Sequence, residues 1–223
     1  MLQLSDFKQK VTTEIYRATG SGSGLTLTLR RILAEVESVL ARHEEVDFSH
    51  IDCHAGCRSC CVVNVSVLFP EALAIADEVR SWPDSEQQKL TERLDELWRA
   101  VRGLTDDERI SLSRPCAFLD DAGCCRIYPV RPILCRSVTS TSAEACRAAL
   151  VEPLFEEKPQ VQMNLAQKEL FEAVYLGVGD GLERAGIDGR GAKLTGFVRY
   201  LLREPVAAHR LLRGEKIDWH EFA

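Results

Sequence analysis

The sequence predicts a mainly α-helical domain arranged around an irregular, cysteine-rich core that two loop blocks form. Several segments repeat apolar residues at the three- and four-residue steps of an amphipathic helix. All nine cysteines fall within two blocks, residues 53–61 and 116–146. Proline and glycine interrupt the second block and favour loops over long regular elements there. We therefore divide the chain into an N-terminal helical segment (1–49), a cysteine-cluster domain (50–150) and a C-terminal helical segment (151–223) packed on the same core.

The N-terminal segment contains a weakly periodic stretch, a linker and one clear helix. Residues 1–20 have weak helical periodicity, and the Gly/Ser-rich run at 18–24 predicts a flexible link or loop. The helix that follows has its apolar residues on one face, namely Leu25, Leu29, Ile32, Leu33, Val36, Val39 and Leu40.

A short extended segment and three helices are predicted between the two cysteine blocks. Apolar residues alternate over 63–69 and permit a short strand, after which Pro70 opens a helix that runs to Arg80. Ser85 and Thr105 each begin a Ser/Thr-x-x-Glu/Gln capping box. These boxes predict the starts of two further helices, the second over 105–112.

The rest of the chain is also predicted to be helical. A third capping box begins at Thr141 and places Cys146 in the second turn of a helix. The glycine-rich stretch 177–181 is interpreted as a break between helices, because no strand precedes it and no Lys-Ser/Thr follows it. Residues 194–202 have the best apolar stripe of this part. The terminal residues 218–222 either dock on a partner or on the protein itself, or fray.

Composition and charge argue against several classes of partner. Hydrophobic residues make up 45% of the chain and charged residues 28%, as in an ordinary globular domain. The net charge of −6 offers no basic face for a nucleic acid. No apolar run is long enough for a transmembrane helix, and the polar N-terminus does not resemble a secretory signal. We expect a cytoplasmic protein with no membrane association and an unidentified protein partner, if any.

The cysteine spacing indicates metal ligation. In a reducing cytosol, clustered cysteines bind metal or do redox chemistry more often than they form disulfides, and an odd number cannot pair completely. Cys57-x-x-Cys60 has the spacing at which two thiolates converge on one metal. Cys53 extends this to Cys-x3-Cys-x2-Cys, which can wrap three corners of a cubane cluster. Cys61 adjoins Cys60, so its easier partner is a second metal or the far side of a cluster.

Arginines lie within a few residues of the cysteines. They could offset the negative charge of metal-bound thiolates and donate hydrogen bonds to sulfur, although simple solvation at the surface explains them equally well. These arginines are Arg58, Arg126, Arg131, Arg136 and Arg147.

The full pattern resembles the YkgJ-type cysteine cluster family. Cys-x3-Cys-x2-Cys-Cys is followed by Pro-Cys-x-Phe-Leu, Cys-x-Ile-Tyr and Arg-Pro-x-x-Cys-Arg over roughly residues 50–150. The resemblance implies a zinc- or iron-chelating domain, and a similar cysteine region in flagellin lysine N-methylases implies an iron–sulfur cluster. Carried over by motif, the ligands are Cys53, Cys57, Cys60, Cys61, Cys116, Cys125 and Cys135, with Cys146 as the eighth. Cys124 is then the spare cysteine.

Metal identity and role stay open at the level of sequence. Eight thiolates fit two tetrahedral zinc sites, one 4Fe-4S cluster with spare cysteines, or a multinuclear centre. His50 and His54 are near enough to be auxiliary ligands, although solvated loop histidines are commoner. A radical-SAM barrel is excluded because helices follow the motif. We favour an iron or iron–sulfur centre with a redox, electron-transfer or sensing role, or one that supports an undefined reaction; the alternative is a structural zinc or metal-handling module.

Overall fold

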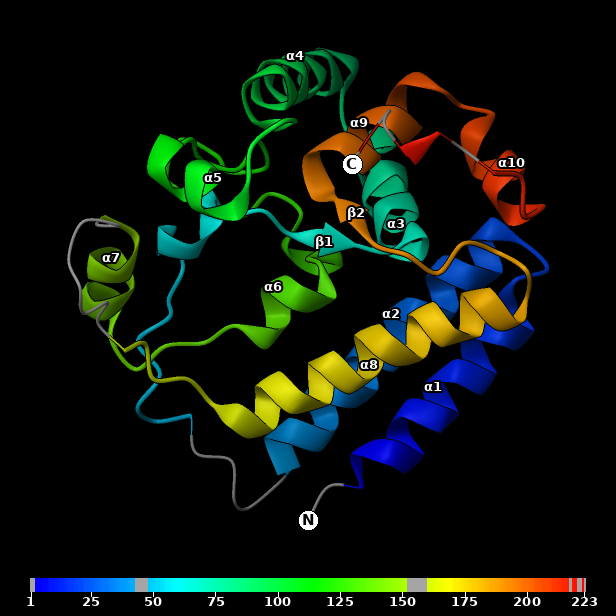
Figure 1. Ribbon diagram of the computed structural model, residues 1–223, viewed down its shortest axis with the longest axis horizontal. Helices are drawn as coiled ribbons and strands as arrows, with labels where there is room; N and C mark the ends of the chain where they lie inside the picture. Colours follow the sequence, from blue (N-terminus) through cyan, green and yellow to red (C-terminus); the bar gives the residue numbers. More distant parts are fainter. Residues whose placement is uncertain (1–2, 43–47, 152–159, 217, 220–221, 223) are drawn as a thin grey trace.

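The computed structural model describes residues 3–42, 48–151, 160–216, 218–219 and 222. Helices dominate this part of the chain (Figure 1), as the sequence predicts. The α-helices described are α1 (Leu4–Ala18), α2 (Gly22–Arg42), α3 (Phe69–Arg80), α4 (Asp84–Val101), α5 (Asp106–Leu112), α6 (Ile133–Ser137), α7 (Ala143–Val151), α8 (Leu165–Arg184), α9 (Leu194–Arg203) and α10 (Ala207–Leu212). Two 3₁₀ turns, η1 (Ser59–Val62) and η2 (Tyr128–Val130), and two short strands, β1 (Ser66–Val67) and β2 (Ala192–Lys193), complete it.

Helices α1, α2 and α8 form one side of the molecule. Helix α8 runs alongside α1 and α2 (Figure 1), and α1 and α8 make the most extensive helix contact. Gly177 and Gly181, which the sequence suggested as a break between helices, lie inside α8 instead. A Cβ at Gly177 would lie 2.8 Å from the Lys8 carbonyl oxygen, and one at Gly181 would lie 2.8 Å from that of Thr12. The glycines therefore allow two helix backbones to approach closely.

Replacing Gly177 with alanine is expected to destabilise the protein by about 1–3 kcal/mol, because the new methyl group forces α1 and α8 apart. Urea unfolding measures the change. Gly20→Ala is the matched control, because no heavy atom lies within 4 Å of a Cβ at that position. Equal unfolding midpoints for the two variants would contradict the close helix crossing.

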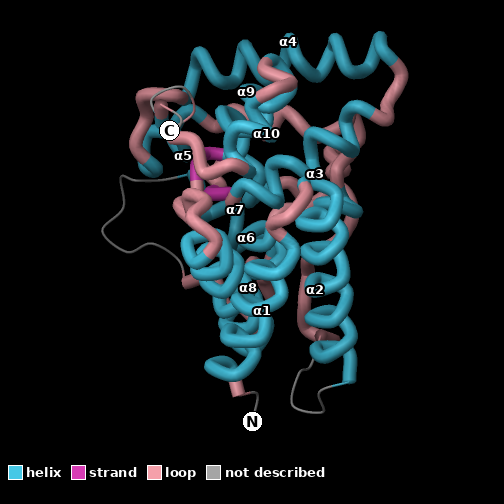
Figure 2. Tube along the Cα trace, turned by 90° about the vertical axis from the view of Figure 1, so that its right-hand side faces the viewer, coloured by secondary structure: helices cyan, strands magenta, loops and turns pink. Residues whose placement is uncertain are grey.

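Helix α3 is the hub that connects the N-terminal and C-terminal helices. Most of its residues are buried, and it packs against α2 on one side and α9 on the other. Helix α9 also contacts α4, which lies across one end of the molecule (Figure 2). The C-terminal tail docks here on the protein itself: Phe222 is buried, and its ring stacks 4.8 Å from that of Phe197.

The two-stranded sheet connects the segment after the first cysteine block to the segment before α9. Strand β1 pairs antiparallel with β2, with Ser66 opposite Lys193. The Leu194 N–H, at the start of α9, donates to the Val65 carbonyl at 2.8 Å. The extended segment predicted over 63–69 is thus a strand of only two residues, because α3 begins at Phe69 and ends the alternation.

Helix starts agree with the sequence at some positions and differ at others. The Thr105 capping box is present as predicted, with the Thr105 hydroxyl accepting from the Glu108 N–H. The Ser85 box is wrong, since α4 already begins at Asp84 and the Pro83 carbonyl accepts from the Glu86 N–H at 2.8 Å. Ser142 rather than Thr141 caps α7, because its hydroxyl accepts from the Ala145 N–H.

The predicted linker at 18–24 is shorter than expected, because α2 begins at Gly22.

Candidate metal centre

The first cysteine block is a chain of tight turns before α3. Gly56 has a φ of 85°, a left-handed conformation that suits glycine, and the Cys57 N–H donates to the His54 carbonyl at 3.0 Å. The η1 turn then carries Cys60 and Cys61 as neighbours. These turns bring thiols that are close in sequence to the same region without using a regular helix or strand.

The second block lies directly against the first. The Cys116 N–H donates to the Cys61 carbonyl at 2.7 Å, so these two cysteines are joined through their backbones. Gly123, with a φ of 79°, faces Gly56: a Cβ at Gly123 would lie 3.2 Å from the Gly56 carbonyl oxygen. The intervening helices α3, α4 and α5 therefore return the chain to its first cysteine block.

Asp52 joins Cys53 to the helix that carries Cys146. Its N–H donates to the Ser140 carbonyl at 2.8 Å, and its carboxylate accepts from the Ala143 N–H, the first residue of α7, at 2.7 Å. A carboxylate at this position satisfies a free N–H and suits the helix dipole. The Cys53 thiol itself lies 3.9 Å from the Ser140 carbonyl oxygen. No feature of the sequence pattern marks Asp52 as a positioning residue.

Four thiols form an outer group at this end of the site. The pKa of Cys53 is raised above its ordinary value, first by burial and then by repulsion from three neighbouring thiolates. Those neighbours are Cys57, Cys60 and Cys146. We call Cys53, Cys57, Cys60 and Cys146 the outer thiol group; the charge of Cys60 also acts on Cys61 and Cys135, so this cysteine adjoins both sets of thiols.

Four further thiols form an inner group, of which Cys116 and Cys125 pack against the hydrophobic core. Burial raises the pKa of Cys116 to about 11 and that of Cys135 to about 12, and neighbouring thiolates contribute to both shifts. Cys125 lies beside them and pairs through a single antiparallel bridge with Leu119. We call Cys61, Cys116, Cys125 and Cys135 the inner thiol group.

A hydrogen bond links the two groups. The Cys61 thiol donates to Cys60, which raises the pKa of Cys61 and lowers that of Cys60. The positive charge of Arg131 lowers the pKa of Cys60 further. The two groups thus adjoin at the consecutive residues Cys60 and Cys61.

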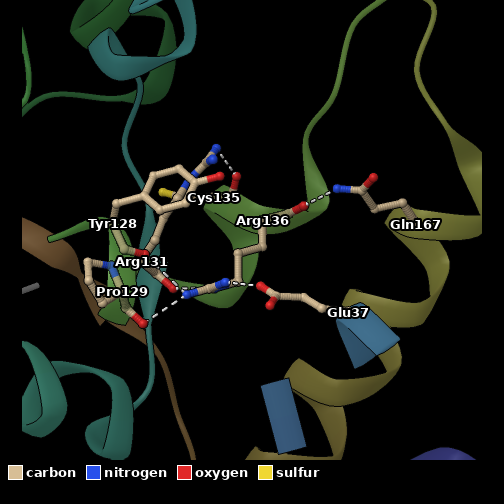
Figure 3. A network of polar contacts seen from close by, with 7 residues as sticks. All are labelled: Glu37, Tyr128, Pro129, Arg131, Cys135, Arg136 and Gln167. Carbon is tan, nitrogen blue, oxygen red and sulfur yellow. Dashed lines mark hydrogen bonds and ion pairs between the residues drawn. The ribbon is translucent and has the colours of Figure 1, made fainter. Parts of the chain in front are cut away.

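Cationic side chains surround the inner thiol group. Arg131 donates to the Cys135 carbonyl, and its charge opposes the raised pKa of Cys125 and Cys135. Arg136 donates to the carbonyls of Tyr128 and Pro129 and pairs with Glu37, while its own carbonyl accepts from Gln167 at 2.6 Å (Figure 3). This network fixes the turn that leads into the Cys135 segment.

Of the other arginines that the sequence places near the cysteines, two are exposed and one is paired with a carboxylate. Arg58 and Arg147 are exposed, and Arg126 pairs with Glu86 and stacks 4.0 Å over the Trp82 ring. Two arginines that the sequence pattern does not indicate, Arg93 on α4 and Arg109 on α5, also act on Cys116 by their charge. Both arginines lie on helices outside the cysteine blocks, so the cysteine spacing gives no signal for either of them.

Cys124, His50 and His54 are not assigned to either thiol group. The Cys124 N–H donates to the Asp120 carboxylate at 2.8 Å, within a turn that the Asp120 N–H closes on the Cys124 carbonyl at 2.9 Å. His50 and His54 are exposed, and the His54 Nδ1 lies 2.8 Å from the Asp52 carbonyl.

The donor chemistry of the site fits a thiophilic metal. All nine cysteines are free thiols, and the charges of nearby arginines act on the inner group in the sense that would compensate metal-bound thiolates. In the described part of the chain, no three Cys, His, Asp or Glu side chains meet the spacing of a formed metal site. The thiols that would share one metal are therefore assigned by which thiols lie near one another. Metal binding would draw their sulfurs together and release their protons.

The comparison with protein families places the chain. A model for the CxxCxxCC family, described as a "Putative zinc- or iron-chelating domain", matches residues 52–164. The chain belongs to the CxxCxxCC family. The match covers every cysteine of the chain and supports metal binding in general. No curated protein and no solved structure matches the chain.

A cavity of about 480 Å³ adjoins the arginine network, between α2, α8 and the η2 turn, and Arg131 and Arg136 line it together with Tyr128 and Phe171. In the described residues, helices with the length and apolar character needed to span a bilayer are absent.

Proposed function

We propose that this protein is an iron-binding protein in which Cys53, Cys57, Cys60, Cys61, Cys116, Cys125, Cys135 and Cys146 ligate an iron–sulfur centre. The observation that carries the proposal is the meeting of the two cysteine blocks, joined by the 2.7 Å hydrogen bond from Cys116 to Cys61. The outer and inner thiol groups each hold four thiols, the number that one 4Fe-4S cluster needs.

The proposed role is electron transfer or redox sensing in the cytoplasm. An iron–sulfur centre supplies one-electron redox chemistry when bound. The chain's own residues hold the thiols in place through the turns at Gly56 and Gly123, and the arginines lower the cost of gathering negative sulfurs. Hydrogen bonds and charges near the sulfurs also tune the reduction potential of such a centre.

The alternative is a pair of structural zinc sites in a binding or metal-handling module. Two groups of four thiols favour it, because four thiolates around one ion are the usual structural zinc site. In that case the helices would present a binding surface, and the metal would stabilise the fold without redox chemistry.

Anaerobic purification followed by metal and sulfide analysis is expected to give a brown protein that contains iron and acid-labile sulfide. Its broad visible absorption should bleach on reduction with dithionite. A chelator-treated sample is the control and should be colourless. A colourless protein that contains stoichiometric zinc would establish the alternative, and a protein free of both metals would overturn both functions.

A further inference from the structure

Arg109 is a buried cation with an unsatisfied donor. It lies on α5, its residue is only 3% exposed, and its Nη1 has no hydrogen-bond partner in the described part of the chain. Among the described residues, no carboxylate forms an ion pair with Arg109. Other arginines around the site differ: Arg126 pairs with Glu86, and Arg136 pairs with Glu37.

An unpaired buried guanidinium is costly, because it loses its hydration without gaining a counter-charge. Arginine also stays charged in proteins, so deprotonation offers no relief. Such a group is stable where an anion lies beside it. The neighbour whose charge acts on Arg109 is the Cys116 sulfur of the inner thiol group.

A metal centre at the inner group would provide that anion. Four thiolates around one divalent ion carry a net charge of about −2, and a 4Fe-4S cluster held by four cysteines is also anionic. Guanidinium N–H groups are well suited to donate to metal-bound sulfur.

We propose that Arg109 is the buried counter-charge of the metal centre held by the inner thiol group, and that it stabilises this centre and not the outer one. The proposal rests on the proposed metal-binding function, but holds for either iron–sulfur or zinc. Arg109 would be a positioning and charge-compensating residue, because it acts by charge on the Cys116 sulfur and is not itself a ligand.

Arg109→Met tests the proposal, because methionine removes the charge and keeps much of the apolar volume. Metal retention is measured on the anaerobically purified protein by titration with EDTA. The released thiols are mapped by alkylation and mass spectrometry. Arg109→Met is expected to retain metal about 10–100-fold less tightly, the range seen when groups that support ligands are removed. Cys61, Cys116, Cys125 and Cys135 should become alkylated before Cys53, Cys57, Cys60 and Cys146.

Two control variants distinguish charge from general disruption. Arg109→Lys keeps a cation and should recover most of the metal retention. Arg114→Gln removes an exposed arginine that is nearer to Cys116 in sequence, and should behave like the wild type. Chelator-stripped Arg109→Met should be at least as stable as the stripped wild type, because it no longer buries an unpaired charge.

A purely structural Arg109 gives a different pattern. In that case Arg109→Met lowers the unfolding midpoint of the loaded and stripped proteins equally, and leaves metal retention and the order of alkylation unchanged. That result overturns the proposal while the wild type still binds metal. A wild type that contains neither iron nor zinc overturns the proposed function, and the role of Arg109 with it.

Discussion

Replacing Cys135 with serine is expected to lower metal content and fold stability in the same sample. Cys135 lies in α6 beside the other inner thiols, and serine is a poor ligand for a soft metal. Metal binding and folding are linked, so ligand loss removes a sizeable part of the roughly 10 kcal/mol that such a site contributes. Elemental analysis and urea unfolding of one preparation measure both effects.

Cys57→Ser is expected to have the same two effects through the outer thiol group. If the groups hold separate centres, Cys57→Ser and Cys135→Ser each remove only one portion of the metal. Cys124→Ser is the matched control, because Cys124 closes a turn on Asp120 through its backbone. A Cys124→Ser protein that loses metal, beside a Cys125→Ser protein that keeps it, would reverse the assignment of these adjacent cysteines.

Sequence periodicity predicts the long helices well because their apolar faces are local patterns. The run from Leu25 to Leu40 gives α2, and the apolar residues from Leu90 to Val101 give most of α4. The start of α4 was missed, because Pro83 supplies the carbonyl that accepts the first helical N–H groups and Ser85 is not needed as a cap.

The local sequence pattern fails to predict a continuous helix at the glycines of α8. Gly177 and Gly181 are weak helix formers, so a local interpretation places a break there. Their helical conformation depends on α1, which packs so closely that larger side chains would clash. Tertiary packing therefore determines the structure at these positions, and no single-sequence signal identifies the partner helix.

The cysteines of the site can be identified from sequence, but their surroundings cannot. Cysteine spacing identifies candidate ligands because ligation requires sulfur at short intervals. Arg109 and Glu71 belong to helices outside both cysteine blocks, and folding alone brings them to the site. A charged residue in a helix is normally interpreted as solvated, so its burial appears only in three dimensions.

Glu71 is a buried carboxylate that holds two helix starts together. Its two oxygens accept from the Leu68 N–H at 2.8 Å and from the Ile133 N–H at 2.7 Å. Ile133 is the first residue of α6, which carries Cys135. Glu71→Ala leaves both buried donors unpaired and is expected to cost about 3–5 kcal/mol. Urea unfolding measures the loss, and EDTA titration should show weaker metal retention as α6 loosens.

Glu71 also gives the fold a pH dependence of defined sign. Burial raises its pKa from 4.5 to about 7, against the opposing effect of the two N–H donors and Arg136. Between these values the native state holds a proton that the unfolded state has lost, so this contribution to stability falls as pH rises. It is fully present below pH 4.5 and decreases by roughly 3 kcal/mol by about pH 7.

Unfolding of the wild type and Glu71→Gln at a series of pH values isolates this effect. Glutamine is not ionised, so the stability advantage of the wild type over Glu71→Gln should shrink from pH 4.5 towards pH 7. Losses shared by both proteins, such as acid release of metal, cancel in the difference. Glu78→Gln is the control. Glu78 lies on the same helix, is partly exposed and pairs only loosely with Arg30 at 3.8 Å. The stability of Glu78→Gln should therefore stay within about 0.5 kcal/mol of the wild type at every pH. Parallel pH profiles for the wild type and Glu71→Gln would mean that Glu71 is ionised throughout, with its two N–H donors outweighing the cost of burial.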